Sequence, residues 1–338
     1  MLASKTLLRP TRLPLHPRFA RPFTSTLSPL SSQPNHLQTL LQNRELQQSD
    51  AENELRWITS WVREEAKGMM KKRKLPPVED ERIGGFVQRR AEGEPLQYIL
   101  GSIDFGPLTI KCKKPVLIPR PETAHIFTLL SSSILSSVPS LTSRDRPSSP
   151  LTVLDLCTGS GCVGLLMAHE NLMAEVTGVD NSPAAVALAG ANVRDNELGE
   201  RVDIRYGNVF GLPQGLLGGK GKVGVVVSNP PYIPLHEWEQ LPKGVREYES
   251  PAALLGDGKK AGEGLAFYER IAEILPELLQ SEEEMEGKGW KGIPRVAVEV
   301  GLGQARKVEE IFKKSEVVGR TEVWKDQYGV ERMVVGWS

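Results

Sequence analysis

Apolar residues recur at helical spacing in the first third of the chain. From about residue 36 to residue 90, three amphipathic stripes begin near Leu37, Leu55 and Ile83. Such stripes are typical of helices that bury one face, and few β-branched runs interrupt them here. Residues 36–92 are therefore predicted to form a small helical domain.

Beyond residue 150, short apolar runs alternate with segments rich in Ala and Leu. Five of these runs are predicted strands: 152–156, 175–179, 202–206, 222–228 and 295–300. Strands that alternate with helices indicate a parallel sheet covered on both faces. Two final runs, 321–325 and 331–336, predict a terminal hairpin that adds an antiparallel strand to the sheet. The predicted fold class is therefore α/β, with the sheet in residues 151–338.

Residues 93–150 are predicted to connect the two domains. Their first part has the composition of turns and short strands, and a hairpin between 108–111 and 115–118 is expected. Residues 131–150 are rich in Ser and Pro, which interrupts the periodicity, and the end of this stretch is expected to be a flexible surface connection.

Composition narrows the classes of partner. The chain has 338 residues, with 42 basic and 42 acidic side chains, so no overall field favours nucleic acid or a membrane surface. Three cysteines, Cys112, Cys157 and Cys162, provide no even disulfide framework and indicate a reducing compartment. The five histidines show no metal-ligand spacing, and no metal site is expected.

The N-terminal segment differs from the rest of the chain. Residues 1–44 contain no Asp or Glu, whereas basic residues are interleaved there with Leu, Ser and Thr. This composition is typical of an organellar transit peptide, so residues 1–35 are predicted to direct the protein to the mitochondrial matrix. An ordinary disordered tail is the alternative. The basic run 67–74 is interpreted as a solvated helix end, with an electrostatic contact to RNA as the alternative.

Four residues, Asn229-Pro230-Pro231-Tyr232, follow the apolar run 223–228 and are the most informative feature of the chain. We call them the Asn-Pro-Pro-Tyr motif. The Asn229 side-chain carbonyl and the Pro230 carbonyl can both accept hydrogen bonds from one NH2 group. The prolines fix φ and carry no competing N–H, and the Tyr232 ring offers a flat face to a planar amide. The motif is thus predicted to hold a planar nitrogen nucleophile.

A glycine-rich loop follows the first predicted strand. Gly159, Gly161 and Gly164 let backbone approach a ligand, and Asp180 lies about 20 residues on, where a carboxylate binds ribose hydroxyls. These residues alone leave NAD and S-adenosylmethionine both open. Asp155, an acceptor near the expected place of a methionine ammonium, and the Asn-Pro-Pro-Tyr motif favour S-adenosylmethionine, because a dehydrogenase needs no amide-holding pocket.

Several separated motifs resemble the HemK/PrmC family of protein-(glutamine-N5) methyltransferases. The similarity runs from about residue 93 to the C-terminus and rests on five stretches: 93–101 (GEPLQYILG), 117–123 (LIPRPET), 155–161 (DLCTGSG), 227–234 (VSNPPYIP) and 247–254 (EYESPAAL). The resemblance implies a Rossmann-like methyltransferase sheet, preceded by a helical domain that docks the substrate. The implied substrate is a peptide chain release factor, methylated on the glutamine of its Gly-Gly-Gln motif.

The resemblance also assigns roles to residues. It implies that Thr158, Gly159, Ser160, Gly161, Asp180 and Asn229 contact the cofactor, with Asp155 behind the loop. Asn208 and Val209 stand where the family often has an acidic residue and a bulky one against the adenine, and the Asn208 carbonyl can still accept from an adenine amino group. Cys157 replaces a common Gly, which is tolerable if the φ of this residue is negative.

The expected mechanism is positioning and desolvation, with Asn229, Pro230, Pro231 and Tyr232 as the amide-binding residues. No strong general base is needed, because a methylated amide nitrogen sheds its proton readily. The main alternative is an adenine-N6 nucleic-acid methyltransferase, since an exocyclic base amine presents the same NH2 group. Less favoured are a non-catalytic assembly factor and an NAD-dependent oxidoreductase. A pI near 7.0 does not favour DNA binding.

Overall fold

The computed structural model describes residues 34–72, 78–138, 147–258 and 260–338. The chain divides into two compact units. Residues 103–240 and 249–338 form the sheet unit, whereas the described residues from 34 to 102, together with 241–248, form the helical unit. No described helix has both the length and the apolar character that a membrane crossing requires.

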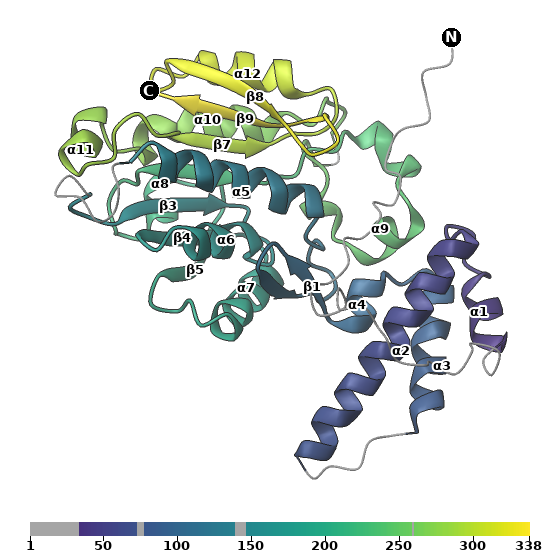
Figure 1. The fold of residues 1–338 in the computed structure, drawn as a ribbon. Helices are drawn as coiled ribbons and strands as arrows, with labels where there is room; N and C mark the ends of the chain where they lie inside the picture. Colours follow the sequence, from purple (N-terminus) through teal and green to yellow (C-terminus); the bar gives the residue numbers. More distant parts are fainter. Residues whose placement is uncertain (1–33, 73–77, 139–146, 259) are drawn as a thin grey trace. The chain divides into compact units, whose positions relative to one another are not determined.

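The helical unit is built from amphipathic helices, as the sequence predicts (Figure 1). Its helices are α1 (Pro34–Leu40), α2 (Gln48–Lys71), α3 (Glu79–Ala91), α4 (Leu96–Leu100) and α9 (Lys243–Tyr248). Leu40, Leu55, Ile58 and Ile83 are almost completely buried, so one member or more of each predicted stripe faces the core. The basic run 67–74 begins on α2, and its last two residues lie outside the described part of the chain.

The sheet unit contains a seven-stranded sheet with the order β5-β4-β3-β6-β7-β9-β8. The strands are β3 (Leu151–Leu156), β4 (Ala174–Asp180), β5 (Val202–Tyr206), β6 (Val225–Ser228), β7 (Val296–Glu299), β8 (Arg320–Lys325) and β9 (Glu331–Trp337). The first five are parallel to one another, and β9 pairs antiparallel with both β7 and β8. This arrangement confirms the predicted parallel sheet and its terminal antiparallel hairpin.

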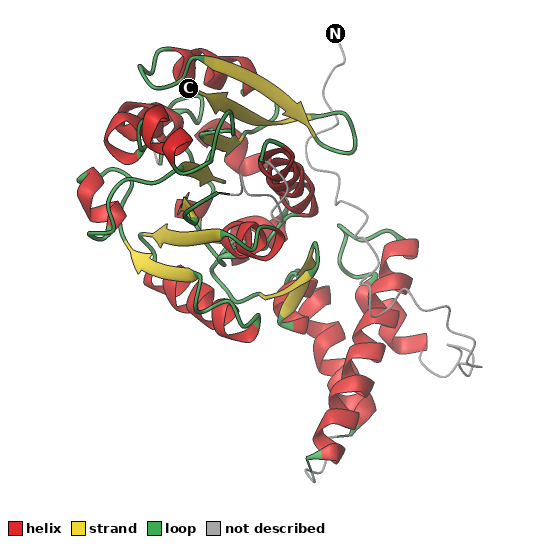
Figure 2. Cartoon of the chain, turned by 60° about the vertical axis from the view of Figure 1, so that its left-hand side comes forward, coloured by secondary structure: helices red, strands yellow, loops and turns green. Residues whose placement is uncertain are grey.

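Helices cover both faces of this sheet (Figure 2). One hydrophobic cluster packs α5 (Pro121–Ser136) and α6 (Cys162–Glu170) against inward residues such as Val153 and Val227. A second cluster packs α10 (Ala266–Leu278) and α12 (Ala305–Lys313) against the alternate residues of the same strands. The central strands β6 and β7 are therefore buried on both sides, which explains their mostly apolar sequences, whereas the edge strands β5 and β8 are only partly buried.

Three more α-helices and two 3-10 helices, Leu235–Gln240 and Pro251–Ala253, complete the described part of this unit. α7 (Pro183–Asp195) follows β4, α8 (Pro213–Leu217) lies between β5 and β6, and α11 (Glu282–Gly287) precedes β7. The side chain of Ser182 caps α7 by accepting a hydrogen bond from the Ala185 amide at 3.3 Å.

The hairpin predicted in the connecting segment is wrong, and the Ser- and Pro-rich stretch begins inside a helix. The small hairpin joins β1 (Ser102–Phe105) to β2 (Leu108–Lys111), and residues 115–118 form no strand. Gly106, with a φ of 57°, turns the chain directly after β1, and Pro115 has no N–H to donate to a ladder. Residues 131–136 belong to helix α5, because packing of buried residues such as Ile134 outweighs the low helix propensity of serine. Residues 139–146 lie outside the described residues.

Candidate active site

The candidate side chains gather where three neighbouring parallel strands end. β3 lies between β4 and β6, so the carboxyl ends of these strands meet at one edge of the sheet. Asp155 lies near the end of β3, Asp180 is the last residue of β4, and Asn229 directly follows β6. Open α/β sheets bind ligands at this edge, at the point where the strand order reverses.

Asp155 is a buried carboxyl group with one oxygen left unpaired. Its Oδ2 accepts hydrogen bonds from the Thr158 hydroxyl at 2.6 Å and from the Gly164 amide at 3.0 Å. Its Oδ1 is also buried and has no hydrogen-bond partner among the described residues. Burial raises the pKa of Asp155 to about 7, although the bonds from Thr158 and Gly164 act in the opposite direction. An unpaired buried acceptor is costly, so the site suits a ligand with a cationic N–H donor.

Glycines let the loop after β3 turn tightly. Gly159 and Gly161 have φ values of 55° and 84°, a region that favours glycine. A Cβ on Gly161 would also lie 3.1 Å from the Cβ of Ala189 on α7. Ser160 is buried between them, and its carbonyl accepts a hydrogen bond from the Asn192 side chain at 2.9 Å. The loop thus exposes backbone to a ligand while its own shape is fixed from behind.

Cys157 has a positive φ of 59°, so the condition under which a side chain is readily tolerated there is not met. A residue with a Cβ pays a steric cost of about 1–2 kcal/mol in this region. The next residue explains how the conformation is held, because the Thr158 amide donates to the Val179 carbonyl of β4 at 3.0 Å. Burial raises the pKa of the Cys157 thiol well above its ordinary value, so the thiol stays neutral.

Asp180 connects the first two strand ends. Its Oδ2 accepts from the Gly159 amide and its Oδ1 from the Ser182 amide, both at 2.9 Å. Burial raises the pKa of Asp180 from its ordinary value, and the backbone hydrogen bonds act against that shift. Each oxygen keeps a further lone pair, so the carboxylate can also accept from ligand hydroxyls.

Asn208 and Val209 follow β5 at the same edge of the sheet. The Asn208 Oδ1 accepts from the Phe210 amide at 3.0 Å, which leaves one lone pair for a ligand amino group. Val209 is buried, and its carbonyl accepts from Arg270 Nε at 3.1 Å. This segment can therefore present one acceptor and an apolar surface to a planar ring.

The Asn-Pro-Pro-Tyr motif is held from both sides of its backbone. The Asn229 Nδ2 lies 3.4 Å from the Thr123 hydroxyl of α5. The Tyr232 amide donates to the Leu254 carbonyl at 3.1 Å, and the Tyr232 carbonyl accepts from Gln304 Nε2 at 2.9 Å. Burial raises the pKa of Tyr232, which keeps its phenol neutral.

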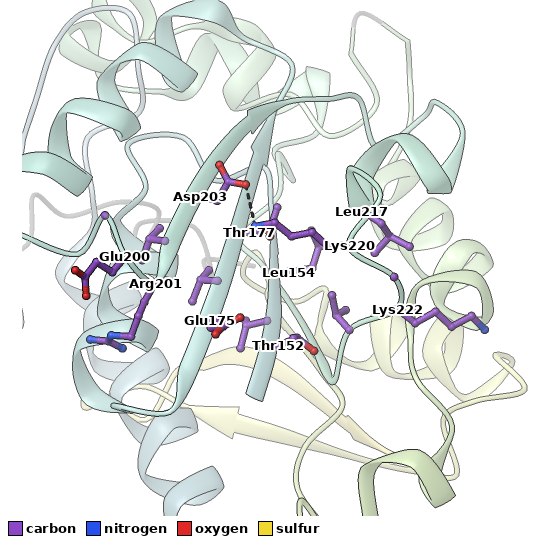
Figure 3. A pocket seen from close by; sticks show the side chains of 16 residues that line it. Thr152, Leu154, Glu175, Thr177, Glu200, Arg201, Asp203, Leu217, Lys220 and Lys222 are labelled. Carbon is purple, nitrogen blue, oxygen red and sulfur yellow. Dashed lines mark ion pairs between the residues drawn. The ribbon is translucent and has the colours of Figure 1, made fainter. Parts of the chain in front are cut away.

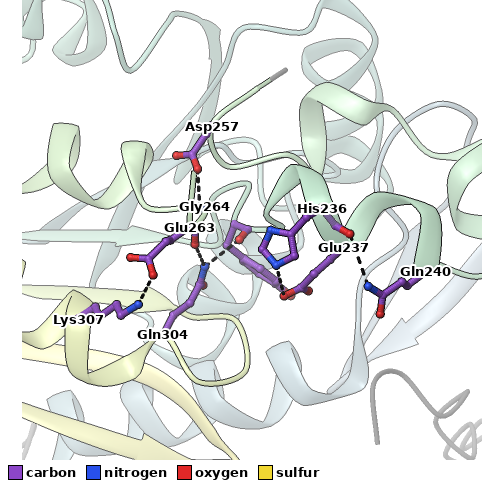
Figure 4. Close-up of polar contacts among 9 residues, drawn as sticks. His236, Glu237, Gln240, Asp257, Glu263, Gly264, Gln304 and Lys307 are labelled. Carbon is purple, nitrogen blue, oxygen red and sulfur yellow. Dashed lines mark hydrogen bonds and ion pairs between the residues drawn. The ribbon is translucent and has the colours of Figure 1, made fainter. Parts of the chain in front are cut away.

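Gln304 and Gly264 form a brace behind the motif (Figure 4). Gln304 Nε2 also donates to the Glu263 carbonyl at 2.7 Å, and Gln304 Oε1 accepts from the Gly301 amide at 2.9 Å. The Gly264 amide donates to Asp257 Oδ2 at 2.6 Å. Every polar atom of the Gln304 amide is thus used to join three loops.

Sequence reasoning missed most of these supporting residues. Gln304 and Asp257 belong to none of the motifs described above, and an isolated Gln or Asp gives no local signal in the sequence. Arg120 lies in the matching stretch 117–123, and its Nη2 donates to both carboxylate oxygens of the buried Glu249, at 2.8 and 2.9 Å. That pair joins two of the matching stretches, 117–123 and 247–254.

A cavity of about 310 Å³ lies at the opposite edge of the sheet (Figure 3). Thr152, Glu175 and Val202 line it, and these residues lie at the amino ends of β3, β4 and β5. Lys220 and Asp203, also in its wall, form an ion pair with each other at 2.9 Å. The cavity therefore lies at the other end of the strands from the cluster of Asp155, Asp180 and Asn229.

The raised pKa of Asp155 predicts how stability depends on pH. Between the ordinary pKa of 3.8 and the folded value of about 7, only the folded state keeps the proton, so the contribution of Asp155 to stability falls as pH rises. Asp155→Asn removes this titration. Relative to wild type, its free energy of unfolding should increase from pH 4 to pH 8 by an amount on the order of a few kcal/mol.

Thermal unfolding at both pH values measures the difference. Asp195→Asn is the matched control, because the Asp195 side chain is 43% exposed. The same offset between Asp155→Asn and wild type at pH 4 and pH 8 would contradict the assignment.

The fold and the site define the class of protein. The sheet has a glycine loop after β3, a carboxylate at the end of β4 and, at Asp155, a buried oxygen without a hydrogen-bond partner among the described residues. These features fit a nucleoside ligand that carries an ammonium group. The chain is an S-adenosylmethionine-dependent methyltransferase with a Rossmann-like sheet.

Comparison with known proteins gives the family. Residues 138–242 match the methyltransferase small domain, and residues 35–101 match the PrmC N-terminal domain. A release factor glutamine methyltransferase of Geobacter sulfurreducens is 36% identical over 262 residues, which cover 78% of this chain and 80% of that protein. The Bacillus subtilis protein of the same name is 34% identical over 261 residues, with coverages of 77% and 81%. The chain belongs to the release factor glutamine methyltransferase family.

One solved structure that aligns with the chain is a methyltransferase from Pyrococcus furiosus. It covers 68% of this chain and 89% of its own, at 17% identity and a TM-score of 0.45.

Proposed function

We propose that this protein methylates the side-chain amide nitrogen of the glutamine in the Gly-Gly-Gln motif of a mitochondrial peptide chain release factor. The observation that carries the proposal is the Asn-Pro-Pro-Tyr motif at the carboxyl end of β6, next to Asp155 and Asp180. It offers two acceptors to one NH2 group at the edge where the cofactor would lie. The names of the bacterial relatives support a release factor as the substrate.

One set of site residues would bind the cofactor and another would bind the substrate glutamine. Asp155, Thr158, Ser160 and Asp180, with the glycines of the loop, would hold the cofactor, which supplies an electrophilic methyl group when bound. Asn208 and Val209 would face its adenine. The protein contributes to methyl transfer mainly by placing the two ligands correctly and by excluding water from between them.

On the substrate side, Asn229 Oδ1 and the Pro230 carbonyl accept hydrogen bonds from the two N–H groups of the glutamine amide. Pro231 fixes the backbone between them and the Tyr232 ring packs on the amide plane. The nitrogen lone pair is thereby directed away from the acceptors and toward the methyl donor. Loss of one proton after methylation completes the reaction, and the proton can pass to solvent.

The mitochondrial part of the proposal rests on composition. Residues 1–44 lack carboxylates and are interleaved with basic side chains, and residues 1–33 lie outside the part of the chain that the structure describes. A fluorescent reporter fused behind residues 1–35 should enter mitochondria. The matched control replaces Arg9, Arg12, Arg18 and Arg21 by Gln, and the reporter should then stay in the cytosol. Import of neither fusion would contradict this location, and import of both would show that the four arginines are not what directs it.

Methyl transfer from labelled S-adenosylmethionine tests the substrate. The purified protein is offered a mitochondrial release factor, the same factor with its Gly-Gly-Gln glutamine changed to alanine, and an adenine-containing oligonucleotide. Label in the wild-type factor alone is the expected result. Label in the oligonucleotide alone would mean that the motif holds an exocyclic base amine, which serves the alternative reaction.

A further inference from the structure

Two buried residues from distant parts of the chain lie behind Asn229. Thr123 is in the first turn of α5 and Glu299 is the last residue of β7, and their exposed fractions are 1% and 2%. The Thr123 hydroxyl donates to Glu299 Oε2 at 2.6 Å. The Asn229 Nδ2 in turn donates to the same hydroxyl oxygen at 3.4 Å. The three side chains form one line of hydrogen bonds that ends at the motif.

The direction of this line follows from the chemistry of its members. An ionised carboxylate only accepts, so the single Thr123 proton points to Glu299. Only lone pairs of the Thr123 oxygen then face Asn229. The amide NH2 of Asn229 suits that surface, whereas the amide oxygen would meet another acceptor. Asn229 Oδ1 is therefore turned away from Thr123.

The protonation state of Glu299 sets the pH at which this line is tested. Burial raises the pKa of Glu299 to about 7, and the nearby Glu122 adds to that shift. The hydrogen bond from Thr123 and the charges of Arg332 and Arg120 act in the opposite direction. At pH 8.5 the carboxylate is mostly ionised, so measurements made there test the line of hydrogen bonds in the direction described.

We propose that Thr123 and Glu299 are positioning residues that fix which end of the Asn229 amide faces the acceptor glutamine. The inference rests on the proposed function, in which Asn229 Oδ1 accepts from the substrate NH2. Without the line of hydrogen bonds the Asn229 amide can rotate by 180°, and its NH2 would then face the NH2 of the substrate. Two donors cannot bond to each other, so the rotated form is unproductive.

Thr123→Val tests this role, because valine keeps the shape of threonine and removes the hydroxyl. We expect kcat for methyl transfer at pH 8.5 to fall about 10- to 100-fold, the range of a lost buried hydrogen bond in an active site. Affinity for S-adenosylmethionine, measured by calorimetry, should stay unchanged. Thr123→Ser restores the hydroxyl and should recover most of kcat. Thr321→Val is the matched control, since Thr321 donates to Glu309 at 2.9 Å on a different part of the sheet unit.

A second measurement uses the enzyme alone. The Asn229 side-chain NH2 is assigned in an amide nitrogen NMR spectrum by its loss in Asn229→Asp, and its exchange with solvent is followed. Protection should be present in wild type and Thr123→Ser and lost in Thr123→Val. Equal exchange in all three proteins would overturn the hydrogen-bond line. Loss of protection with unchanged kcat would overturn its positioning role.

The kinetic and the exchange measurements together distinguish failure of the proposed function from failure of the positioning role. If wild-type protein leaves a release factor unmethylated, the proposed function fails, while the exchange measurement still decides whether Thr123 orients Asn229. If wild type is active and Thr123→Val matches it in both kcat and exchange, only the inference about positioning fails.

Discussion

Asn229→Ala should reduce kcat for methyl transfer by about 10²–10³-fold or more, the size of effect seen when one preorganised polar contact is removed from an active site. The reason is that the substrate NH2 loses an acceptor and its lone pair is no longer directed. Affinity for S-adenosylmethionine should change little, because Asp155, Asp180 and the glycine loop remain. Single-turnover kinetics and calorimetry measure the two quantities separately.

Asn196→Ala serves as the control, since it removes a side-chain amide that bonds to the Thr109 carbonyl at 3.1 Å. Its kcat should equal that of wild type. A fully active Asn229→Ala protein would contradict the mechanism. So would a variant that has lost cofactor binding to the same extent as activity.

Gly264→Ala should have the second large effect, through the brace behind the motif. Gly264 has a φ of 78°, and a Cβ there would lie 2.0 Å from the Tyr232 carbonyl oxygen and 2.8 Å from Gln304 Nε2. The backbone of Tyr232 must therefore move, and displacement of a positioned group by about 1 Å can cost about 10²-fold in rate. We expect kcat to fall by that order, together with a lower Tm.

Gly329→Ala separates steric clash from backbone strain. Gly329 has a nearly equal φ of 77°, in the turn between β8 and β9, and a Cβ there would meet nothing within 4 Å. It should lower Tm by about 2–4 °C per kcal/mol of strain and leave kcat unchanged. Equal losses of activity in the two variants would show that the contact with Tyr232 is not what matters.

The sequence predicted the sheet well because its central strands are buried on both faces. The predicted strand 222–228 needs no tertiary information, since the three consecutive valines 225–227 and their apolar flank already indicate a covered parallel strand. The hairpin was harder. The sequence alone paired 108–111 with 115–118, whereas the turn at Gly106 pairs it with the preceding strand, Ser102–Phe105.

In the site, the sequence predicted only the features that are formed by adjacent residues. The Asn-Pro-Pro-Tyr motif and the glycine loop are contiguous, so their acceptors and backbone shape can be inferred from adjacent residues. Thr123 and Glu299 are 176 positions apart and meet only because α5 covers the sheet beside β7. The positive φ of Cys157 is likewise set by the hydrogen bond between Thr158 and β4, and no local sequence pattern predicts that hydrogen bond.

Peptide mapping of a mitochondrial release factor after incubation with the enzyme and S-adenosylmethionine tests the central claim most directly. Fragmentation mass spectrometry locates the added methyl group. The account predicts one methyl group, on the side-chain nitrogen of the Gly-Gly-Gln glutamine, in the factor treated with wild-type enzyme and not in the factor treated with Asn229→Ala. A methyl group on any other residue, or an unmodified factor beside methylated adenine in nucleic acid, would contradict it.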